Sequence, residues 1–257
     1  MQDFTKLGSV DTAIENGIAT IEFQHPAHNS MPGQLLAQLA HAISDAGEND
    51  TVKLIVLKSA GDRTFCAGAS FDELSAIENL ESGTRFFMGF ANVINAMRKC
   101  PKFIIGRVQG KAVGGGVGLA AATDYCMATK YASVKLSELA VGIGPFVVGP
   151  AVERKIGTSA FTQLAINATE WQTADWAKEK GLFNEVFSTI EQMDAYIVHL
   201  AEKLVASNPD AMRHLKNVFW KGTEHWETLL SERAAMSGQL VMSDFTKKAI
   251  AAFKNKA

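Results

Sequence analysis

The sequence predicts an α/β fold with a core over residues 1–190 and a helical region over residues 191–257. Three observations support this division. A β-hairpin signal lies near the N-terminus, apolar strands alternate with amphipathic helices along the core, and strand signals stop near residue 189. Alternation of this kind is typical of sheets that are covered by helices.

The core begins with the hairpin, because Asn16-Gly17 supplies the positive φ angles of a two-residue turn. Pro32 then begins a helix. Its apolar residues recur at helical spacing, namely Leu35, Leu36, Leu39 and Ile43. A strand is predicted over residues 53–58.

A second helix is predicted from Thr84 to Lys99, and Pro101 ends it. Four side chains would face the interior, namely Phe87, Phe90, Ile94 and Met97. A strand over residues 103–108 follows, and shorter strands are predicted at 124–128 and 133–136.

The region after Thr189 carries apolar residues in helical patterns, with a break at Asn208-Pro209-Asp210. Short helices with several apolar faces cannot bury all of this apolar surface against one another, so we expect them to pack on the core or on another subunit. The four tryptophans are interpreted as core or subunit-contact residues and not as a platform for bases: Trp171, Trp176, Trp220 and Trp226.

Composition predicts a cytoplasmic protein without a membrane span. No stretch approaches eighteen uncharged apolar residues, and the N-terminus carries no apolar targeting segment. A net charge of −2 argues against a broad nucleic-acid surface. The odd number of cysteines suits a reducing compartment, with Cys66, Cys100 and Cys126 as buried small side chains. His25 and His28 lack a third ligand nearby, so no metal site is predicted.

Two glycine- and alanine-rich turns carry the chemistry: residues 65–69, after the strand at 53–58, and residues 113–118, after the strand at 103–108. Such turns expose backbone N–H groups, and a helix that begins there adds the positive end of its dipole. Two turns of this kind can share one developing oxyanion.

On these residues the chain resembles the enoyl-CoA hydratase/isomerase, or crotonase, family over about residues 10–190. The resemblance implies a spiral core of ββα units, and C-terminal helices that build homotrimers, commonly stacked into hexamers. It also implies that the N–H groups of Ala69 and Gly115 bind the thioester carbonyl of an acyl-CoA and stabilise its enolate.

The predicted base is Glu138, twenty-three residues after Gly115 and at the end of a strand. In the resembled family, a glutamate on this segment faces the carbon next to the thioester. Its apolar neighbours would desolvate the carboxylate and raise its pKa toward neutrality, namely Leu136, Leu139, Val141 and Ile143.

The chain departs from the hydratases of this family at Gly118, where they carry a second glutamate. Hydration uses two carboxylates, whereas moving a double bond needs only one base. Residues 142–146 also resemble the Δ3,Δ2-enoyl-CoA isomerases. We therefore predict isomerisation of an enoyl-CoA in fatty-acid or related acyl-CoA metabolism. Two alternatives are a hydratase for a branched or unusual acyl-CoA, and a non-catalytic acyl-CoA binder.

The resemblance further implies a coenzyme A slot lined by Ala27, Asn29, Ala67 and Phe71. Phosphate-binding lysines would come from the tail, namely Lys254 and Lys256, although a lysine-rich C-terminus also fits a solvated end. Coenzyme A enters as part of the substrate, and no separate cofactor is predicted.

Two further patterns suggest other chemistry. Residues 116–121 satisfy the G-x-G-x-x-A dinucleotide pattern, but residues 109–113 intervene after the preceding strand, which disfavours a dehydrogenase. Ser70 could serve as a nucleophile. No histidine is placed beside it, so a helix cap is the favoured interpretation.

Overall fold

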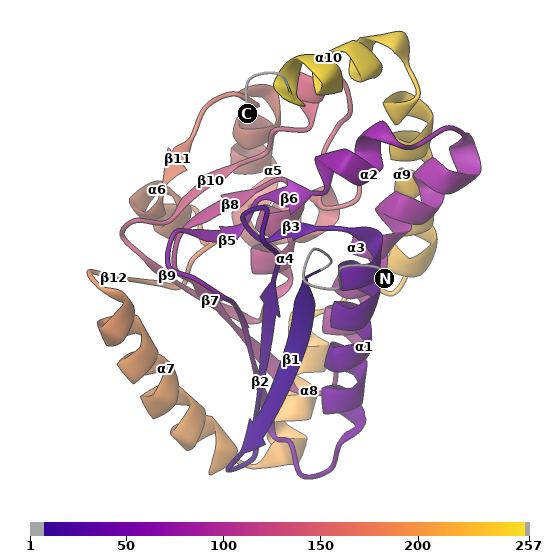
Figure 1. Ribbon diagram of the computed structural model, residues 1–257. Helices are drawn as coiled ribbons and strands as arrows, with labels where there is room; N and C mark the ends of the chain where they lie inside the picture. Colours follow the sequence, from indigo (N-terminus) through magenta and orange to yellow (C-terminus); the bar gives the residue numbers. More distant parts are fainter. Residues whose placement is uncertain (1–7, 255–257) are drawn as a thin grey trace.

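The computed structural model describes residues 8–254, which form an α/β fold of two sheets, one short strand pair and surrounding helices (Figure 1). The first sheet has the order β1-β2-β4-β7-β9-β12. Its strands are β1 (Ser9–Glu15), β2 (Ile18–Gln24), β4 (Leu54–Ser59), β7 (Phe103–Val108), β9 (Tyr125–Thr129) and β12 (Glu185–Phe187). Only β1 and β2 pair antiparallel within it, joined by the predicted turn, where Asn16 has φ 50° and Gly17 φ 82°.

The second sheet has the order β11-β10-β8-β5, and a parallel pair of β3 and β6 extends this side of the molecule. Their bounds are β3 (Ser30–Met31), β5 (Thr64–Cys66), β6 (Gly68–Ala69), β8 (Lys111–Val113), β10 (Ser133–Lys135) and β11 (Gln172–Thr173). Three times along the chain, a strand of the first sheet is followed by a strand of the second sheet: β4 by β5, β7 by β8 and β9 by β10. A helix follows each of these pairs before the chain returns to the first sheet. This alternation is the repeated ββα unit that the resemblance implied.

Helices connect many of these strands, and four further helices follow the last strand. They are α1 (Gly33–Glu48), α2 (Phe71–Ser75), α3 (Leu80–Lys99), α4 (Gly115–Ala122), the 3-10 turn η2 (Leu139–Val141), α5 (Gly149–Ile166), α6 (Ala174–Glu179), α7 (Ile190–Val205), α8 (Pro209–Phe219), α9 (Trp226–Val241) and α10 (Asp244–Lys254). None of them is long and apolar enough to cross a bilayer, within residues 8–254.

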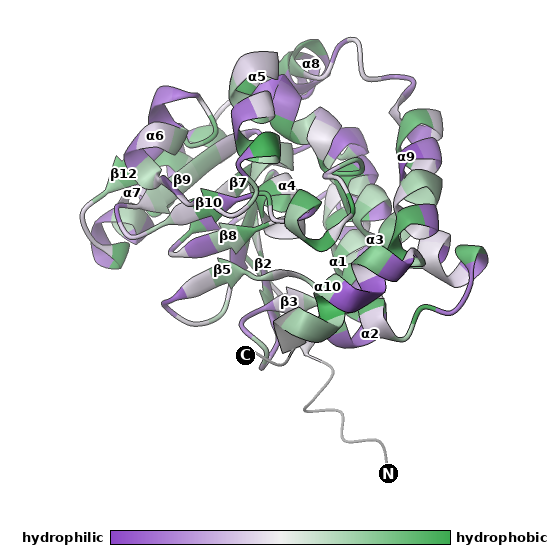
Figure 2. Ribbon diagram, turned by 90° about the horizontal axis from the view of Figure 1, so that it is seen from above, coloured by the Kyte–Doolittle hydropathy of each residue, from purple (hydrophilic) through white to green (hydrophobic). Residues whose placement is uncertain are grey.

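Most of the core lies on one face of the first sheet, where α4 is buried along all eight of its residues. Figure 2 places α4 at the centre of the molecule, surrounded by the other layers. Strand β4 is buried on both faces, because Ile55 and Leu57 contribute to this core, whereas Leu54 and Val56 pack under α7 on the opposite face. Its sequence is therefore continuously apolar, as expected for a central parallel strand.

Helix α3 begins four residues before its predicted start at Thr84. Asn79 and Ser82 form a reciprocal capping box, in which the Asn79 side chain accepts from the Ser82 backbone N–H at 2.9 Å. This polar pair extends the helix beyond its apolar pattern. All four side chains predicted to face inward are buried: Phe87, Phe90, Ile94 and Met97.

The C-terminal helices pack on the core of their own chain. Helix α9 crosses α3 so closely that a methyl group added at Gly83 would lie 2.9 Å from the Gly238 Cα. Two facing glycines permit this approach because neither carries a Cβ. The residues that begin α7 and α8, Thr189 and Asn208, cap them with their side chains, at the predicted boundaries. The assembly of this region into trimers or hexamers stays a prediction.

Candidate active site

The first predicted turn connects β5 to α2. Gly68 adopts φ 86°, a left-handed conformation that favours glycine. Ala69 follows in β6, opposite Met31 of β3. The Ser70 hydroxyl accepts a hydrogen bond from the Glu73 N–H, so the helix-cap interpretation of Ser70 is confirmed. Burial raises the pKa of the Cys66 thiol to about 12, with an opposing hydrogen bond from the Gly68 N–H, so this cysteine stays neutral.

The second predicted turn connects β8 to α4. Gly114 precedes the helix with φ 51°, and its N–H donates to the Lys135 carbonyl at 2.8 Å. Gly115 is the first residue of α4. The N–H groups of a helix's first turn have no intrahelical acceptor, so this end of α4 can offer donors to a ligand.

The fold brings the two turns into direct contact. A methyl group at Gly68 would lie 2.8 Å from the Val113 carbonyl oxygen and 3.5 Å from the Gly115 nitrogen. A methyl group at Gly116 would lie 2.6 Å from the Cys66 carbonyl oxygen. The small residues of both turns are therefore required by packing between the turns as well as by access to their backbone.

Glu138 lies beside the second turn, and a methyl group at Gly114 would be 2.9 Å from its Oε1. The predicted position at a strand end is wrong by three residues. Strand β10 ends at Lys135, and Glu138 begins the η2 turn, where its carbonyl accepts from the N–H groups of Val141 and Ile143. This turn directs the side chain back toward Gly114.

The carboxylate of Glu138 is buried, and its Oε2 has no hydrogen-bond partner within residues 8–254. Burial raises its pKa to about 7, opposed by a weaker hydrogen bond with its own backbone N–H. Of the four predicted apolar neighbours, Leu136 and Ile143 are buried, Val141 is half-buried, and Leu139 is 51% exposed. Leu139 therefore contributes little to the desolvation. A carboxyl group with a pKa near 7 can both accept and return a proton at neutral pH.

Two apolar side chains occupy the space around α4. A methyl group at Gly118 would lie 2.5 Å from Val148 Cγ1, so a longer side chain at this position would collide with the start of α5. The ring of Phe90 from α3 lies against Gly115, 2.1 Å from the position of an added methyl group. Val148 and Phe90 thus make two sides of the space around the turns apolar, and Glu138 supplies a carboxylate beside Gly114.

The predicted coenzyme A slot lies next to the first turn. The Ala67 N–H donates to the His28 carbonyl at 3.2 Å, which holds the exposed loop of Ala27 against this turn. The Asn29 amide is fully used within the protein, since it donates to the Ala60 and Thr64 carbonyls at 2.9 Å and accepts from the His25 N–H at 3.0 Å. Asn29 could therefore serve a ligand only through its backbone.

Phe71 begins α2 and is half-buried against the core. Lys254 ends α10 in the backbone trace, and Lys256 lies outside the described residues. The structure thus places Ala27, Asn29, Ala67 and Phe71 around one turn, and the tail lysines stay a prediction.

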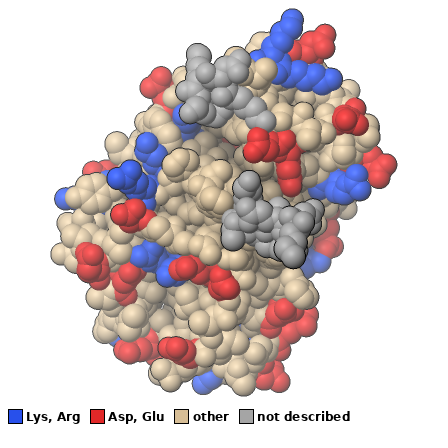
Figure 3. All heavy atoms as spheres, viewed as in Figure 1, with Lys and Arg blue, Asp and Glu red and all other residues tan. Residues whose placement is uncertain are grey.

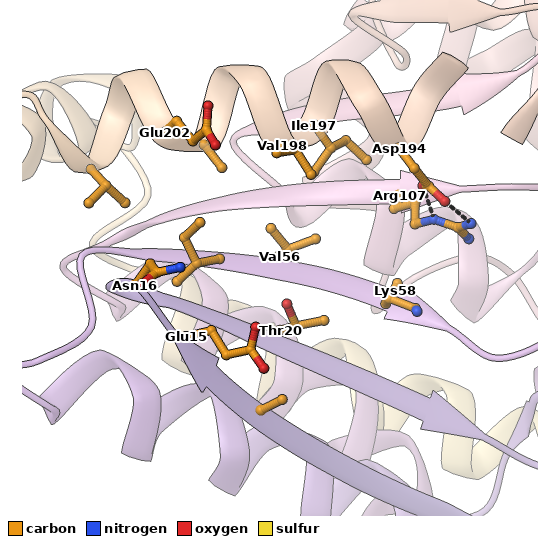
Figure 4. Close-up of a pocket in the computed structure, with 14 residues that line it drawn as sticks. Glu15, Asn16, Thr20, Val56, Lys58, Arg107, Asp194, Ile197, Val198 and Glu202 are labelled. Carbon is orange, nitrogen blue, oxygen red and sulfur yellow. Dashed lines mark hydrogen bonds and ion pairs between the residues drawn. The ribbon is translucent and has the colours of Figure 1, made fainter. Parts of the chain in front are cut away.

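A separate cavity of about 680 Å³ lies on the opposite face of the first sheet, under α7 (Figure 4). Val56 and Ile197 contribute apolar surface to it, and Arg107 forms a two-point ion pair with Asp194 at its edge, at 2.5 and 2.9 Å. None of its lining residues belongs to the two turns. No group of three His, Cys, Asp or Glu side chains in the described range could hold a metal ion.

Comparison with known proteins agrees with this geometry. The sequence model for enoyl-CoA hydratase/isomerase matches residues 13–257, and the chain belongs to this family of enzymes, which act on acyl-CoA thioesters. It is 25% identical to a peroxisomal Delta(3,5)-Delta(2,4)-dienoyl-CoA isomerase of Arabidopsis thaliana, over 98% of this chain and 95% of that protein. It is 27% identical to a short-chain-enoyl-CoA hydratase of Clostridium acetobutylicum, over 98% and 96%.

The fold matches solved structures of the same family. An enoyl-CoA hydratase from Bacillus halodurans superposes with a TM-score of 0.87 at 20% identity, covering 95% of this chain and 99% of that one. The α/β spiral predicted from the sequence is therefore confirmed.

Sequence reasoning missed three features near the site. Phe90 was predicted as a core residue, but its contact with Gly115 depends on how α3 crosses α4. Val148 gave no periodic signal that connects it to Gly118. Trp171 is 40% exposed and lies beside two lysine ammonium groups, so it is not a core residue, and its alternative role in a subunit contact stays a prediction. Trp220 and Trp226 are buried as predicted.

Proposed function

We propose that the protein isomerises the double bond of an enoyl-CoA, with Glu138 as its single acid–base residue. One observation carries the proposal. The only carboxylate found against the second turn is that of Glu138, whereas Val148 fills the space beside Gly118, among the residues described. A second carboxylate at position 118, as the hydratases of the family carry, has no room in this arrangement.

The reaction needs one proton to move between two carbons. Ionised Glu138 removes the proton from C2 of a 3-enoyl-CoA, and the electron pair delocalises onto the thioester oxygen. The N–H groups of Ala69 and Gly115 donate to this oxygen, which stabilises the enolate. Protonated Glu138 then delivers the proton to C4. The double bond moves from C3=C4 to C2=C3, and Glu138 returns to its ionised form.

The pKa of about 7 supports both halves of this cycle. A base of pKa 4.5 would be a weak acceptor for a carbon-bound proton, whereas a base of much higher pKa would hold its proton at neutral pH. Because Oε2 is buried in this structure, side chains around it must move before C2 of a substrate can reach it.

The relatives include both reaction types, a dienoyl-CoA isomerase and an enoyl-CoA hydratase. A direct assay distinguishes them. Purified protein is incubated separately with a 3-enoyl-CoA and a 2-enoyl-CoA of medium chain length, and the absorbance of the conjugated thioester is followed. We expect absorbance to appear from the 3-enoyl-CoA and to stay constant with the 2-enoyl-CoA. Loss of absorbance from the 2-enoyl-CoA would establish hydration and overturn the proposal.

A second assay separates an enzyme from a binding protein. A saturated acyl-CoA in D₂O exchanges its C2 protons whenever an enolate forms, whichever product the enzyme makes. We expect exchange with the natural protein and loss of exchange with Glu138→Gln. Tight binding without exchange would identify a non-catalytic acyl-CoA binder.

A further inference from the structure

Helix α10 packs against two elements of the candidate site. It contacts α2, which follows the first turn, and η2, which begins at Glu138. Figure 1 places α10 next to α2 at the top of the molecule, and Figure 3 shows charged side chains at the top of the same face. The charged residues at the start of α10 are exposed, namely Asp244, Lys247 and Lys248. Thr246 and Ile250 are buried, so α10 turns its uncharged side toward the site.

Gly142 is the point at which α10 meets η2. It ends η2 with φ 81°, a left-handed conformation that favours glycine. A methyl group added there would lie 2.6 Å from the Thr246 Oγ1 and 2.5 Å from the nearest carbon of the Phe245 ring. The first turn of α10 therefore rests directly on the bare backbone of Gly142.

A hydrogen bond joins the two elements at this contact. The Thr246 hydroxyl donates to the Gly142 carbonyl at 3.2 Å, and Thr246 is fully buried. Ser243 supports this bond from the start of α10, since its hydroxyl accepts from the Thr246 N–H at 3.2 Å and donates to the Thr246 Oγ1 at 3.0 Å. Because the Thr246 oxygen accepts the Ser243 proton, its own single proton is directed to Gly142.

The η2 turn connects Gly142 to Glu138. The Glu138 carbonyl accepts from the N–H groups of Val141 at 3.2 Å and Ile143 at 3.0 Å, which are the two neighbours of Gly142. A displacement of Gly142 therefore moves the backbone of Glu138 with it. The Glu138 Oε2 has no hydrogen-bond partner among residues 8–254, so the direction of the side chain depends on this backbone.

No ion pair fixes the Glu138 carboxylate in place of the backbone, within the described part of the chain. Helix α4 and the η2 turn contain no charged residue. On β10, the Lys135 Nζ lies over the Trp171 ring. On α2, Asp72 is exposed and Glu73 accepts from a backbone N–H of α1 at 2.7 Å. Burial and a hydrogen bond with its own backbone account for the pKa of Glu138, without a charged neighbour.

We propose that Thr246 is a positioning residue for Glu138, because its hydroxyl holds the Gly142 carbonyl and thereby keeps the η2 turn and the carboxylate buried beside Gly114. The inference rests on the proposed function, in which Glu138 is the base. A base must stay at a defined distance from the carbon it deprotonates, and a displacement of about 1 Å can lower the rate about 100-fold. A helix outside both turns thus contributes to the rate through one hydrogen bond.

The test compares Thr246→Val with the natural protein. Valine keeps the branched shape of threonine and lacks the hydroxyl. The measured quantity is the exchange of the C2 protons of a saturated acyl-CoA in D₂O as a function of pH. We expect kcat for exchange to fall about tenfold and KM to change less than about twofold, because the backbone donors of the turns are kept. Water that reaches the loosened carboxylate should lower the apparent pKa of kcat/KM from near 7 toward 4.5, by about one pH unit.

Thr129→Val is a matched control for the loss of a buried hydroxyl. Thr129 is also fully buried, and its hydroxyl donates to the Gln109 carbonyl at 2.8 Å and accepts from the Tyr131 N–H at 3.3 Å. It ends β9 and belongs to neither turn nor to η2. We expect Thr129→Val to lower the melting temperature and to keep the natural apparent pKa. An equal change of pKa in this control would show a general loss of packing and refute the inference.

Two further variants test the role of the hydroxyl. Thr246→Ser retains it and should keep the apparent pKa near 7. Ser243→Ala leaves Thr246 in the core and changes a half-buried position, so it provides the measurement if Thr246→Val does not fold. It removes the hydroxyl that directs the Thr246 proton, and we expect the apparent pKa to fall by about half a pH unit. An unchanged pKa in Ser243→Ala would then overturn the inference.

The two proposals fail in different ways. Exchange by the natural protein that Glu138→Gln abolishes, with the natural kcat and apparent pKa in Thr246→Val, would overturn this inference and leave Glu138 as the base. Exchange that persists in Glu138→Gln would remove Glu138 as the base and this inference with it. A natural protein that neither exchanges C2 protons nor isomerises an enoyl-CoA would overturn both proposals.

Discussion

A buried carboxylate lies at each end of α4, and the two carboxylates differ in their hydrogen-bond partners. At the N-terminal end, Glu138 lies against Gly114, and its Oε2 has no partner among the residues described. At the C-terminal end, the side chain of Asp124 is 4% exposed, and both of its carboxylate oxygens have partners. Both groups are carboxylates removed from water, so the difference lies in what surrounds them.

Asp124 is held by three donors, one from β7 and two from α8 and its C-terminal cap. Its Oδ2 lies 2.9 Å from the Lys216 ammonium and 2.8 Å from the Ile104 nitrogen, and its Oδ1 accepts from the Trp220 ring nitrogen at 2.8 Å. Lys216 also donates to the Lys102 carbonyl at 2.7 Å. This network connects α8 to the first sheet and surrounds the buried carboxylate with donors.

The comparison indicates a division of roles. A buried carboxylate with full pairing contributes to the folded structure and has no lone pair left for a substrate. A buried carboxylate without a partner costs stability, and a site that retains it gains a reactive group in return. Glu138 should therefore matter for rate, and the Asp124 network for stability.

The largest expected effect is on catalysis. Glu138→Gln removes the only base that we place at the site, and we expect kcat to fall about 10²- to 10⁴-fold in the isomerisation assay. The melting temperature should not decrease, because no hydrogen bond to Oε2 is lost. The exposed Glu202, which lies beside the cavity under α7, provides a matched control, and Glu202→Gln should retain the natural rate. Full activity in Glu138→Gln would refute the assignment of the base.

The next effect is on folding. Lys216→Met leaves the Asp124 carboxylate buried without its cation and the Lys102 carbonyl without its donor. Breaking one partner of such a pair costs about 3–5 kcal/mol, and we expect this loss in urea denaturation. Lys221→Met, at an exposed lysine two residues beyond α8, should change the free energy of unfolding by less than about 0.5 kcal/mol. Equal stability of the two variants would show that the network is not structural.

The sequence predicted the elements of the Glu138 site better than their surroundings. Gly68, Gly114 and Gly115 could be predicted because turns that expose their backbone require small residues, and runs of small residues can be recognised in the sequence. The positions of Phe90 and Val148 depend on how α3 and α5 cross α4. No local sequence pattern predicts how two helices cross. The pairing of Asp124 with Lys216 joins residues ninety-two positions apart. Neither residue carries a motif, so only the tertiary structure identifies the network.

The comparison can finally be tested with pH, because the carboxyl group of Glu138 has a pKa of about 7 in the folded protein and 4.5 as its ordinary value. Between these values the folded state binds a proton that the unfolded state has released. The stabilisation is therefore complete below about pH 4.5 and is lost as pH rises through about 7. A shift of this size corresponds to at most about 3 kcal/mol.

We therefore expect the free energy of unfolding of the natural protein to fall between pH 5 and pH 8 by up to about 3 kcal/mol more than that of Glu138→Gln. Measuring urea denaturation of both proteins across this range isolates the contribution of Glu138, since all other titrating groups are shared. In the same range kcat/KM should rise with an apparent pKa near 7, because the ionised form is the base. Stability and activity would thus change in opposite directions with pH. Parallel stability curves for the two proteins would mean that Glu138 titrates alike in the folded and unfolded states, which is incompatible with a buried, unpaired carboxylate.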